Sequence, residues 1–277
     1  MPVMSIISCK IMQDEIIWIL ENDSSIDEII VVENENIRGF TEKLNKANLQ
    51  YKMLSLEEIS SLPEIKSECK KYTVLVNLME LGFHRSPKKL KIKVYETIKT
   101  LAPYSSGILL FYGLCGNVLG DVEKDFERSS ISCPVRILKD KEHRIVDDCI
   151  GATVGGFDNY LRRLKSVSDA GTYLFTPVGS KSWRELLDLN KLNKDPAKAL
   201  KLMKKIHEMI GYKRVAKINT GLEYTENFDV SIREFSELFD FKILEFDDGN
   251  QEIFEDCYNK LKVEIRMNKK KVTIQPG

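Results

Sequence analysis

Residues 107–117, Gly-Ile-Leu-Leu-Phe-Tyr-Gly-Leu-Cys-Gly-Asn, join an uninterrupted apolar run to a turn that contains two glycines and a cysteine. An apolar run without polar alternation is typical of a strand that is covered on both faces. The glycines that follow indicate a turn in which the backbone passes close to another group. We therefore predict a buried strand at Gly107–Tyr112, with Cys115 just beyond its carboxyl end.

Similar apolar segments recur along the chain and alternate with amphipathic, helix-like stretches. The other predicted strands are Val3–Ser8, Glu28–Val32, Thr73–Leu78, Pro134–Leu138, Thr172–Thr176, Arg214–Ile218 and Phe241–Phe246. Such alternation predicts βαβ units and an α/β fold with mainly parallel, Rossmann-like sheets. A break near Ser166–Gly171 divides the strands, so we expect two lobes, a cysteine-bearing lobe at 1–166 and a second lobe at 167–277.

Two predicted helices carry clear start or stop signals. Ser86 precedes Pro87, which suits an N-cap followed by the first helical position. Asp195 precedes another proline, and this helix is expected to run to Gly211 as its C-terminal glycine. The second helix is rich in lysine, and we expect its His207 on the surface.

Composition excludes several classes of protein. The chain has 277 residues, of which 43% are hydrophobic, so a core can form and disorder is excluded. Its 42 basic and 42 acidic residues cancel, which argues against a nucleic-acid partner. No run of 18 apolar residues is present, which argues against a membrane span. Met1–Cys9 lacks the features of a secretory signal, and we expect a cytoplasmic protein.

Four soft or borderline metal donors follow predicted strands or begin a helix, where open α/β sheets bind their ligands. They are Cys9, His84, Cys115 and Cys149. Thiolate and imidazole suit zinc, and thiolates suit iron–sulfur clusters, so we predict a metal site from these four residues. The residues expected to contact the cofactor lie beside them: Tyr112, Gly113, Gly116, Asn117 and Asp148.

The remaining cysteines have a different setting. Cys69, Cys133 and Cys257 fall within predicted helices or strands, and free cysteine is among the most buried residue types. No Cys-x-x-Cys pair occurs, and six cysteines are too few for a disulfide scaffold in a chain of this length. We expect these three residues to be dispensable for any bound metal.

Motifs along the chain resemble the prokaryotic domain-of-unknown-function family 1638. The matching residues are Cys9, Gly82, His84, Pro87, Leu90, the run Tyr112-Gly113-Leu114-Cys115-Gly116-Asn117, the run Asp148-Cys149-Ile150, the run Gly171-Thr172-Tyr173, and Thr176-Pro177. The chain departs from the family where Asp147 replaces a usual histidine. The segment Lys139–Val146 looks rebuilt, and its His143 is a candidate substitute.

The resemblance implies a metabolic context for the protein but no reaction mechanism. Family members are associated with corrinoid-dependent methyl transfer and methylamine use, which implies one-carbon metabolism, a corrinoid cofactor or a methyltransferase protein as partner. The three-cysteine layout is also similar to α/β proteins that hold a [4Fe–4S] cluster with three cysteines and leave one iron open.

Three functional hypotheses follow. The first is a metal-dependent protein that uses Cys9, Cys115 and Cys149, with a fourth position for a small-molecule ligand or for His84; a [4Fe–4S] cluster is favoured slightly over zinc. The second is an accessory protein that holds a metal or corrinoid for a partner, without turnover of its own. The third is a thiol enzyme with Cys115 as nucleophile and His84 as base.

Overall fold

The computed structural model describes residues 2–61, 72–131 and 133–273. Its strands form two sheets, and every strand pair in both is parallel. The larger sheet has the order β3-β2-β4-β1-β5-β6, with β1 Val3–Cys9, β2 Glu28–Val32, β3 Lys52–Leu54, β4 Thr73–Met79, β5 Gly107–Phe111 and β6 Val135–Ile137. The smaller sheet has the order β7-β8-β9, with β7 Gly171–Phe175, β8 Tyr212–Ile218 and β9 Lys242–Phe246. The predicted α/β class with parallel, Rossmann-like sheets is confirmed.

The larger sheet is covered on both faces, which explains its uninterrupted apolar strands. Met4 and Ile6 of β1 face one core, and Val3 and Ile7 face the other. Helices α1 Gln13–Asn22, α2 Arg38–Lys46 and α13 Glu252–Thr273 cover the first face. The second face is covered by α3 Leu56–Ser61, α4 Pro87–Leu101 and α5 Val122–Glu127. Three short 3-10 turns complete this part: η1 Lys10–Met12, η2 Leu81–Arg85 and η3 Ala102–Tyr104.

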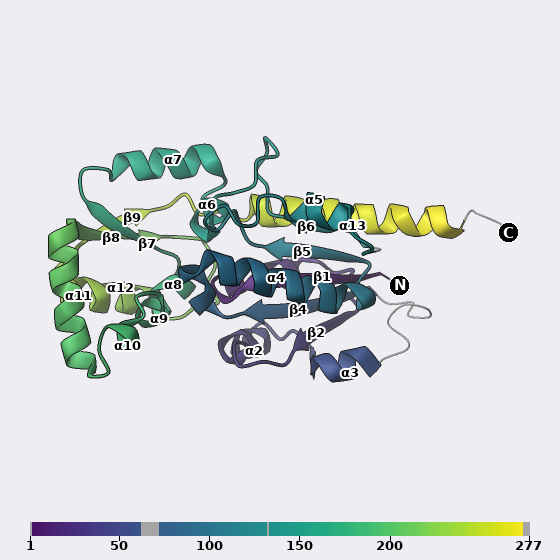
Figure 1. The fold of residues 1–277 in the computed structure, drawn as a ribbon, viewed down its shortest axis with the longest axis horizontal. Helices are drawn as coiled ribbons and strands as arrows, with labels where there is room; N and C mark the ends of the chain where they lie inside the picture. Colours follow the sequence, from purple (N-terminus) through teal and green to yellow (C-terminus); the bar gives the residue numbers. More distant parts are fainter. Residues whose placement is uncertain (1, 62–71, 132, 274–277) are drawn as a thin grey trace.

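The smaller sheet lies beyond one end of the larger one, on the left of Figure 1. Its aromatic core lies under α11 Pro196–Ile210 and α12 Phe228–Phe239. The other face has a smaller core, near α6 Cys149–Thr153 and α7 Phe157–Ser166. The connection after β7 holds three short helices, α8 Pro177–Lys181, α9 Trp183–Leu186 and α10 Leu189–Leu192.

The predicted helix boundaries are largely confirmed. Helix α4 begins at Pro87, although the side chain of Ser86 makes no capping hydrogen bond. Asp195 accepts hydrogen bonds from two backbone N–H groups of the first turn of α11, and Gly211 ends that helix at φ +78°. The expectation that His207 lies on the surface is wrong, since it is 1% exposed. Residues 199, 203 and 207 form one buried stripe on the otherwise lysine-rich α11.

The last helix returns from the smaller sheet to the larger one. Helix α13 follows the smaller sheet in sequence but packs on β5 of the larger one, where Ile265 approaches the place that a side chain on Gly107 would fill. The division at 1–166 and 167–277 therefore stays a prediction. No helix within the described ranges is long and apolar enough to cross a bilayer.

Candidate three-cysteine site

Three central strands of the larger sheet end side by side at the edge where the candidate residues lie. Strand β1 lies between β4 and β5, with Cys9 opposite Met79 and Ser8 opposite Phe111. Cys9 is the last residue of β1, His84 follows β4, and Cys115 follows β5. The carboxyl edge of a parallel sheet gathers its loops in this way, so the topology brings three of the four predicted metal ligands to one place.

The turn that carries Cys115 has a strained backbone. Cys115, Gly116 and Asn117 have φ values of +47°, +77° and +61°. The left-handed region costs a residue with a side chain on the order of 1–3 kcal/mol, and such strain persists where the surroundings enforce it. The turn lifts Cys115 away from the β5 line and toward the space above the strand ends.

Gly113 lets a second segment pass directly against this turn. A Cβ atom at Gly113 would lie 2.4 Å from the carbonyl oxygen of Val146. The N–H of Leu114 donates to that same oxygen at 2.8 Å, and the N–H of Cys115 donates to the carbonyl of Asp147 at 2.9 Å. These backbone contacts hold the segment before Cys149 beside Cys115, although 34 residues separate the two cysteines in sequence.

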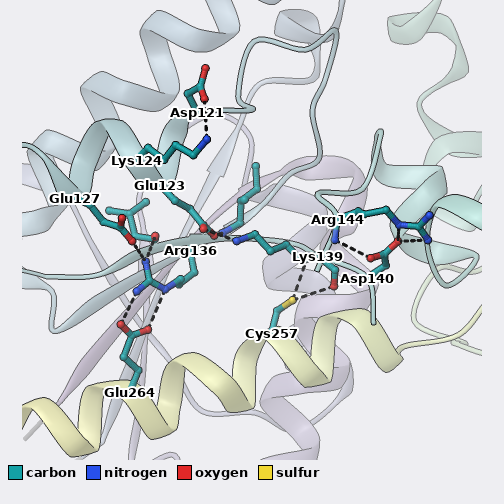
Figure 2. A network of polar contacts seen from close by, with 12 residues as sticks. Asp121, Glu123, Lys124, Glu127, Arg136, Lys139, Asp140, Arg144, Cys257 and Glu264 are labelled. Atoms are coloured by element: carbon teal, nitrogen blue, oxygen red, sulfur yellow. Dashed lines mark hydrogen bonds and ion pairs between the residues drawn. The ribbon is translucent and has the colours of Figure 1, made fainter. Parts of the chain in front are cut away.

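Figure 2 shows how the segment after β6 is anchored before it reaches the site. Arg136 pairs with Glu264 of α13 at 2.6 Å, and the thiol of Cys257 on the same helix contacts the backbone of Lys139. Asp140 pairs with Arg144 at 2.9 Å and closes a small hairpin. His143 lies exposed in this hairpin at φ +61° and does not line the site pocket described below, so it does not stand in for the histidine replaced by Asp147.

Cys149 begins α6, as the sequence indicated, and Asp148 is its N-cap. One carboxylate oxygen of Asp148 accepts from the N–H of Gly151 at 2.9 Å, and the other accepts from the hydroxyl of Tyr160 at 3.0 Å. Burial raises the pKa of Asp148. Asp148 therefore fixes the start of the helix and joins α6 to α7 at the site.

One cavity of about 680 Å³, here called the cysteine pocket, contains the predicted site. Its lining includes Cys9, His84, Tyr112, Cys115, Gly116, Asn117, Asp148 and Cys149. Gly113 does not line it and acts through the backbone packing above. The three cysteines are partly exposed, whereas His84 is exposed. The predicted site residues are thus brought together in one cavity.

Sequence reasoning missed the opposite wall of this pocket. That wall comes from the smaller sheet and its connections: Tyr173, Leu174, Phe175, Leu186 and Leu187. It also missed two acidic residues, Glu80 and Asp147. Glu80 directly follows β4, so the rule that selected Cys9 and Cys115 would have found it too.

The three thiols lie in a setting that opposes ionisation. Burial raises the pKa of Cys9 to about 11 and that of Cys115 to about 12, and it raises the pKa of Cys149 well above its usual value. The negative charge of one thiolate adds to the rise in its neighbours, which shows that the three lie within electrostatic reach of one another. Without a bound cation, all three are thiols at neutral pH.

Tyr112 places an unused polar group beside the thiols. It is 3% exposed, and its hydroxyl has no hydrogen-bond partner within the described part of the chain. Burial raises its pKa well above the ordinary value, with further contributions from the charges of the three cysteines. An unpaired buried hydroxyl costs on the order of 1–3 kcal/mol, which a bound ligand or cofactor atom could recover.

The described residues contain no group of three or more His, Cys, Asp or Glu side chains that could hold a metal ion. Of the other cysteines, Cys133 and Cys257 are buried and do not line the pocket. Cys69 lies outside the described residues.

Comparison with known proteins gives one match. The model of the family described as "Protein of unknown function (DUF1638)" matches residues 78–258. No curated protein and no solved structure matches the chain. The matched range includes Cys115 and Cys149, and Cys9 precedes it.

Proposed function

The chain belongs to the DUF1638 family, and we propose that it is a metalloprotein whose Cys9, Cys115 and Cys149 hold an iron–sulfur cluster beside a pocket for a small organic ligand. The observation that carries the proposal is the convergence of three cysteines from separate segments on one cavity. A cysteine that only fills core volume has no reason to share a cavity wall with two others.

The donor set fits such a group. Burial raises the pKa of all three thiols, and neighbouring thiolates raise the pKa of Cys115 and Cys149 further, so the set is costly to ionise alone and a bound cation supplies the missing positive charge. The backbone N–H of Ile11 favours the Cys9 thiolate and lowers its pKa, and Gly113 does the same for Cys115. Hydrogen bonds to sulfur are one of the means by which proteins tune these clusters, and the free hydroxyl of Tyr112 is a further donor.

A cluster requires less convergence of its cysteine ligands than a single zinc ion does. A single zinc ion needs its ligands around one point, and the described residues offer no group of three that could do this. In a cluster, each cysteine binds a different iron, so the sulfurs need not converge so tightly. An iron without a protein ligand supplies Lewis-acid chemistry when the cluster is bound. His84 is then left at the rim of the pocket and is not required as a ligand.

The thiol-enzyme hypothesis receives less support from the same residues. A nucleophilic cysteine needs a lowered pKa or a base within hydrogen-bond reach. Burial raises the pKa of Cys115 to about 12, and no hydrogen bond joins its thiol to His84 within the described residues. A role in one-carbon or corrinoid metabolism, as enzyme or as accessory protein, stays a prediction from the family resemblance.

Single serine variants test the ligand set. Protein purified without oxygen should lose most of its iron in Cys9→Ser, Cys115→Ser and Cys149→Ser, and the losses should not add when the changes are combined, because the three thiols act as one ligand set. Cys133→Ser and Cys257→Ser are matched controls that should keep their iron. Equal iron in all five variants would contradict the proposal.

A further inference from the structure

We propose that the cysteine pocket selects an organic ligand with an apolar body and a positively charged group, and that it disfavours phosphate and carboxylate ligands. This inference uses the same cavity as the proposed function and names its class of ligand. It depends on the walls of the pocket, and these can be tested whether or not a cluster is bound.

The wall contributed by the smaller sheet is suited to an apolar body. Phe175 is the last residue of β7, and Leu186 and Leu187 lie in the connection that follows it. Tyr173 is held by its hydroxyl, which lies 2.9 Å from the buried His207 Nε2. Because that hydroxyl is engaged behind the wall, the ring of Tyr173 contributes an aromatic surface to the pocket.

The charged groups that line the pocket are acidic. No lysine or arginine lines it within the described ranges, whereas Glu80, Asp147 and Asp148 do. Neither Glu80 nor Asp147 has an ion-pair or side-chain hydrogen-bond partner in the part of the chain that the structure covers. Asp148 accepts hydrogen bonds from an amide and a hydroxyl and has no ion-pair partner within the described residues.

Cations close to the pocket are already paired with other acids. Lys10 follows Cys9 but binds Glu185 at 2.5 Å. Arg85 follows His84 but pairs with Asp188 at 3.2 Å and also donates to the carbonyl of Glu185. The nearest positive charges are therefore engaged by Glu185 and Asp188, and neither forms an ion pair with Glu80 or Asp147 within the described residues.

A second, independent feature also calls for a ligand. Tyr112 lines the same cavity, its buried hydroxyl has no partner within the described residues, and a hydroxyl can donate to or accept from a ligand atom. A cavity of about 680 Å³ holds a drug-sized molecule. A cation inside it would meet two unpaired carboxylates and aromatic faces, both of which attract positive charge. A phosphate would meet like charge and no lysine or arginine among the described lining residues, in contrast to the phosphate sites common at this edge of α/β sheets.

Three probes with the same ring and the same two-carbon arm separate charge from shape. Tryptamine carries an ammonium group, tryptophol a hydroxyl, and indole-3-propionate a carboxylate. We expect ligand-observed NMR titrations of the full chain to show tryptamine binding about tenfold tighter than indole-3-propionate, with tryptophol between them. Glu80→Gln and Asp147→Asn should each reduce this ratio severalfold.

Glu35, like Glu80, is an exposed glutamate that lines a pocket, but its pocket is a neighbouring one. The matched control is therefore Glu35→Gln. It should leave the ratio unchanged. Equal or tighter binding of indole-3-propionate would overturn the inference, and so would an amine preference that survives both pocket variants. Iron is measured in the same samples. A retained amine preference in protein that never binds iron would overturn the proposed function and leave this inference standing.

Discussion

Two pockets open beside the same end of the larger sheet, and they differ in the charged residues that line them. The second pocket, here called the lysine pocket, has a volume of about 420 Å³. Its lining includes the cations Lys10, Arg38, Lys43, Lys46 and Lys181. Four of these have an acidic partner: Lys10 pairs with Glu185, Arg38 with Glu42, Lys43 with Asp14, and Lys46 with Glu226.

The cysteine pocket has no such pairing within the described residues. Its carboxylates Glu80 and Asp147 lack partners, the hydroxyl of Tyr112 is unpaired, and three thiols share one wall. An unpaired buried group such as the Tyr112 hydroxyl reduces stability, and such a group calls for an explanation, for which a ligand or cofactor is one candidate. The comparison supports the proposal that the cysteine pocket, and not the lysine pocket, is the functional one.

The largest effect should come from the buried pair of the lysine pocket. Lys43 binds Asp14 at 2.7 Å, and Lys43→Met leaves the Asp14 charge buried without its cation. We expect a loss of about 3–5 kcal/mol in the free energy of unfolding, measured by urea titration. Lys46→Met is the control, since its pair with Glu226 is exposed and should cost less than about 1 kcal/mol. Folded protein of both variants should keep its iron, and loss of iron in Lys43→Met would break the proposed division of roles.

Glu15 is buried in the first turn of α1 and should give the next largest effect. The charge of the adjacent Asp14 raises the pKa of Glu15, and the charge of Glu15 in turn raises the pKa of Cys149. Burial raises the pKa of Glu15 from 4.5 to about 8. Between these values the unfolded chain has released a proton that the folded chain still holds, so stability is lost as the pH rises.

The loss should approach about 4 kcal/mol between pH 4.5 and 8. Glu15→Gln removes the ionisable group, and its free energy of unfolding should fall less over this range than that of the wild type. Denaturant titrations at pH 5, 6.5 and 8 measure the difference. Parallel pH profiles for the two proteins would show that Glu15 ionises as in water.

Paired glycine variants should give a smaller effect that still separates the pockets. Gly113→Ala forces the backbone of Val146 away from the Cys115 turn, and we expect a loss of about 1–3 kcal/mol together with lower iron content. Gly39 lines the lysine pocket and lies in helix α2, where alanine is favoured over glycine by up to about 1 kcal/mol. In Gly39→Ala the new Cβ would lie 3.6 Å from the Oε1 atom of Gln13, which is an ordinary contact. If both variants keep full iron, the packing at Gly113 does not position the site.

The smallest effect on stability is expected at the rim of the cysteine pocket. Glu80 is exposed and has no ion pair in the described residues, so Glu80→Gln should change the free energy of unfolding by less than about 0.5 kcal/mol. Thermal unfolding of the two proteins side by side measures this. A larger loss would mean that Glu80 stabilises the fold and is not reserved for a ligand.

Local patterns in the sequence were sufficient to predict the strands and part of the site. Continuous apolar runs identified all eight predicted strands, and β3 was missed because it has only three residues, mostly exposed. The rule that ligands bind beyond strand ends selected Cys9 and Cys115 without any structure. Contacts between distant segments were not predictable in this way. The wall at Tyr173 depends on how the two sheets meet. The burial of His207 was obscured by the lysines around it, although residues 199, 203 and 207 follow one another at intervals of four, which was a usable signal.

The central claim is that the three unpaired thiols of the cysteine pocket form one cluster site. Iron and acid-labile sulfide per chain, measured on full-length protein purified without oxygen or chelators, test it most directly. We predict a brown protein with about four iron atoms and a similar amount of sulfide per chain, as a [4Fe–4S] cluster requires. A colourless protein with one zinc per chain, or one without bound metal after reconstitution with iron and sulfide, would contradict the claim.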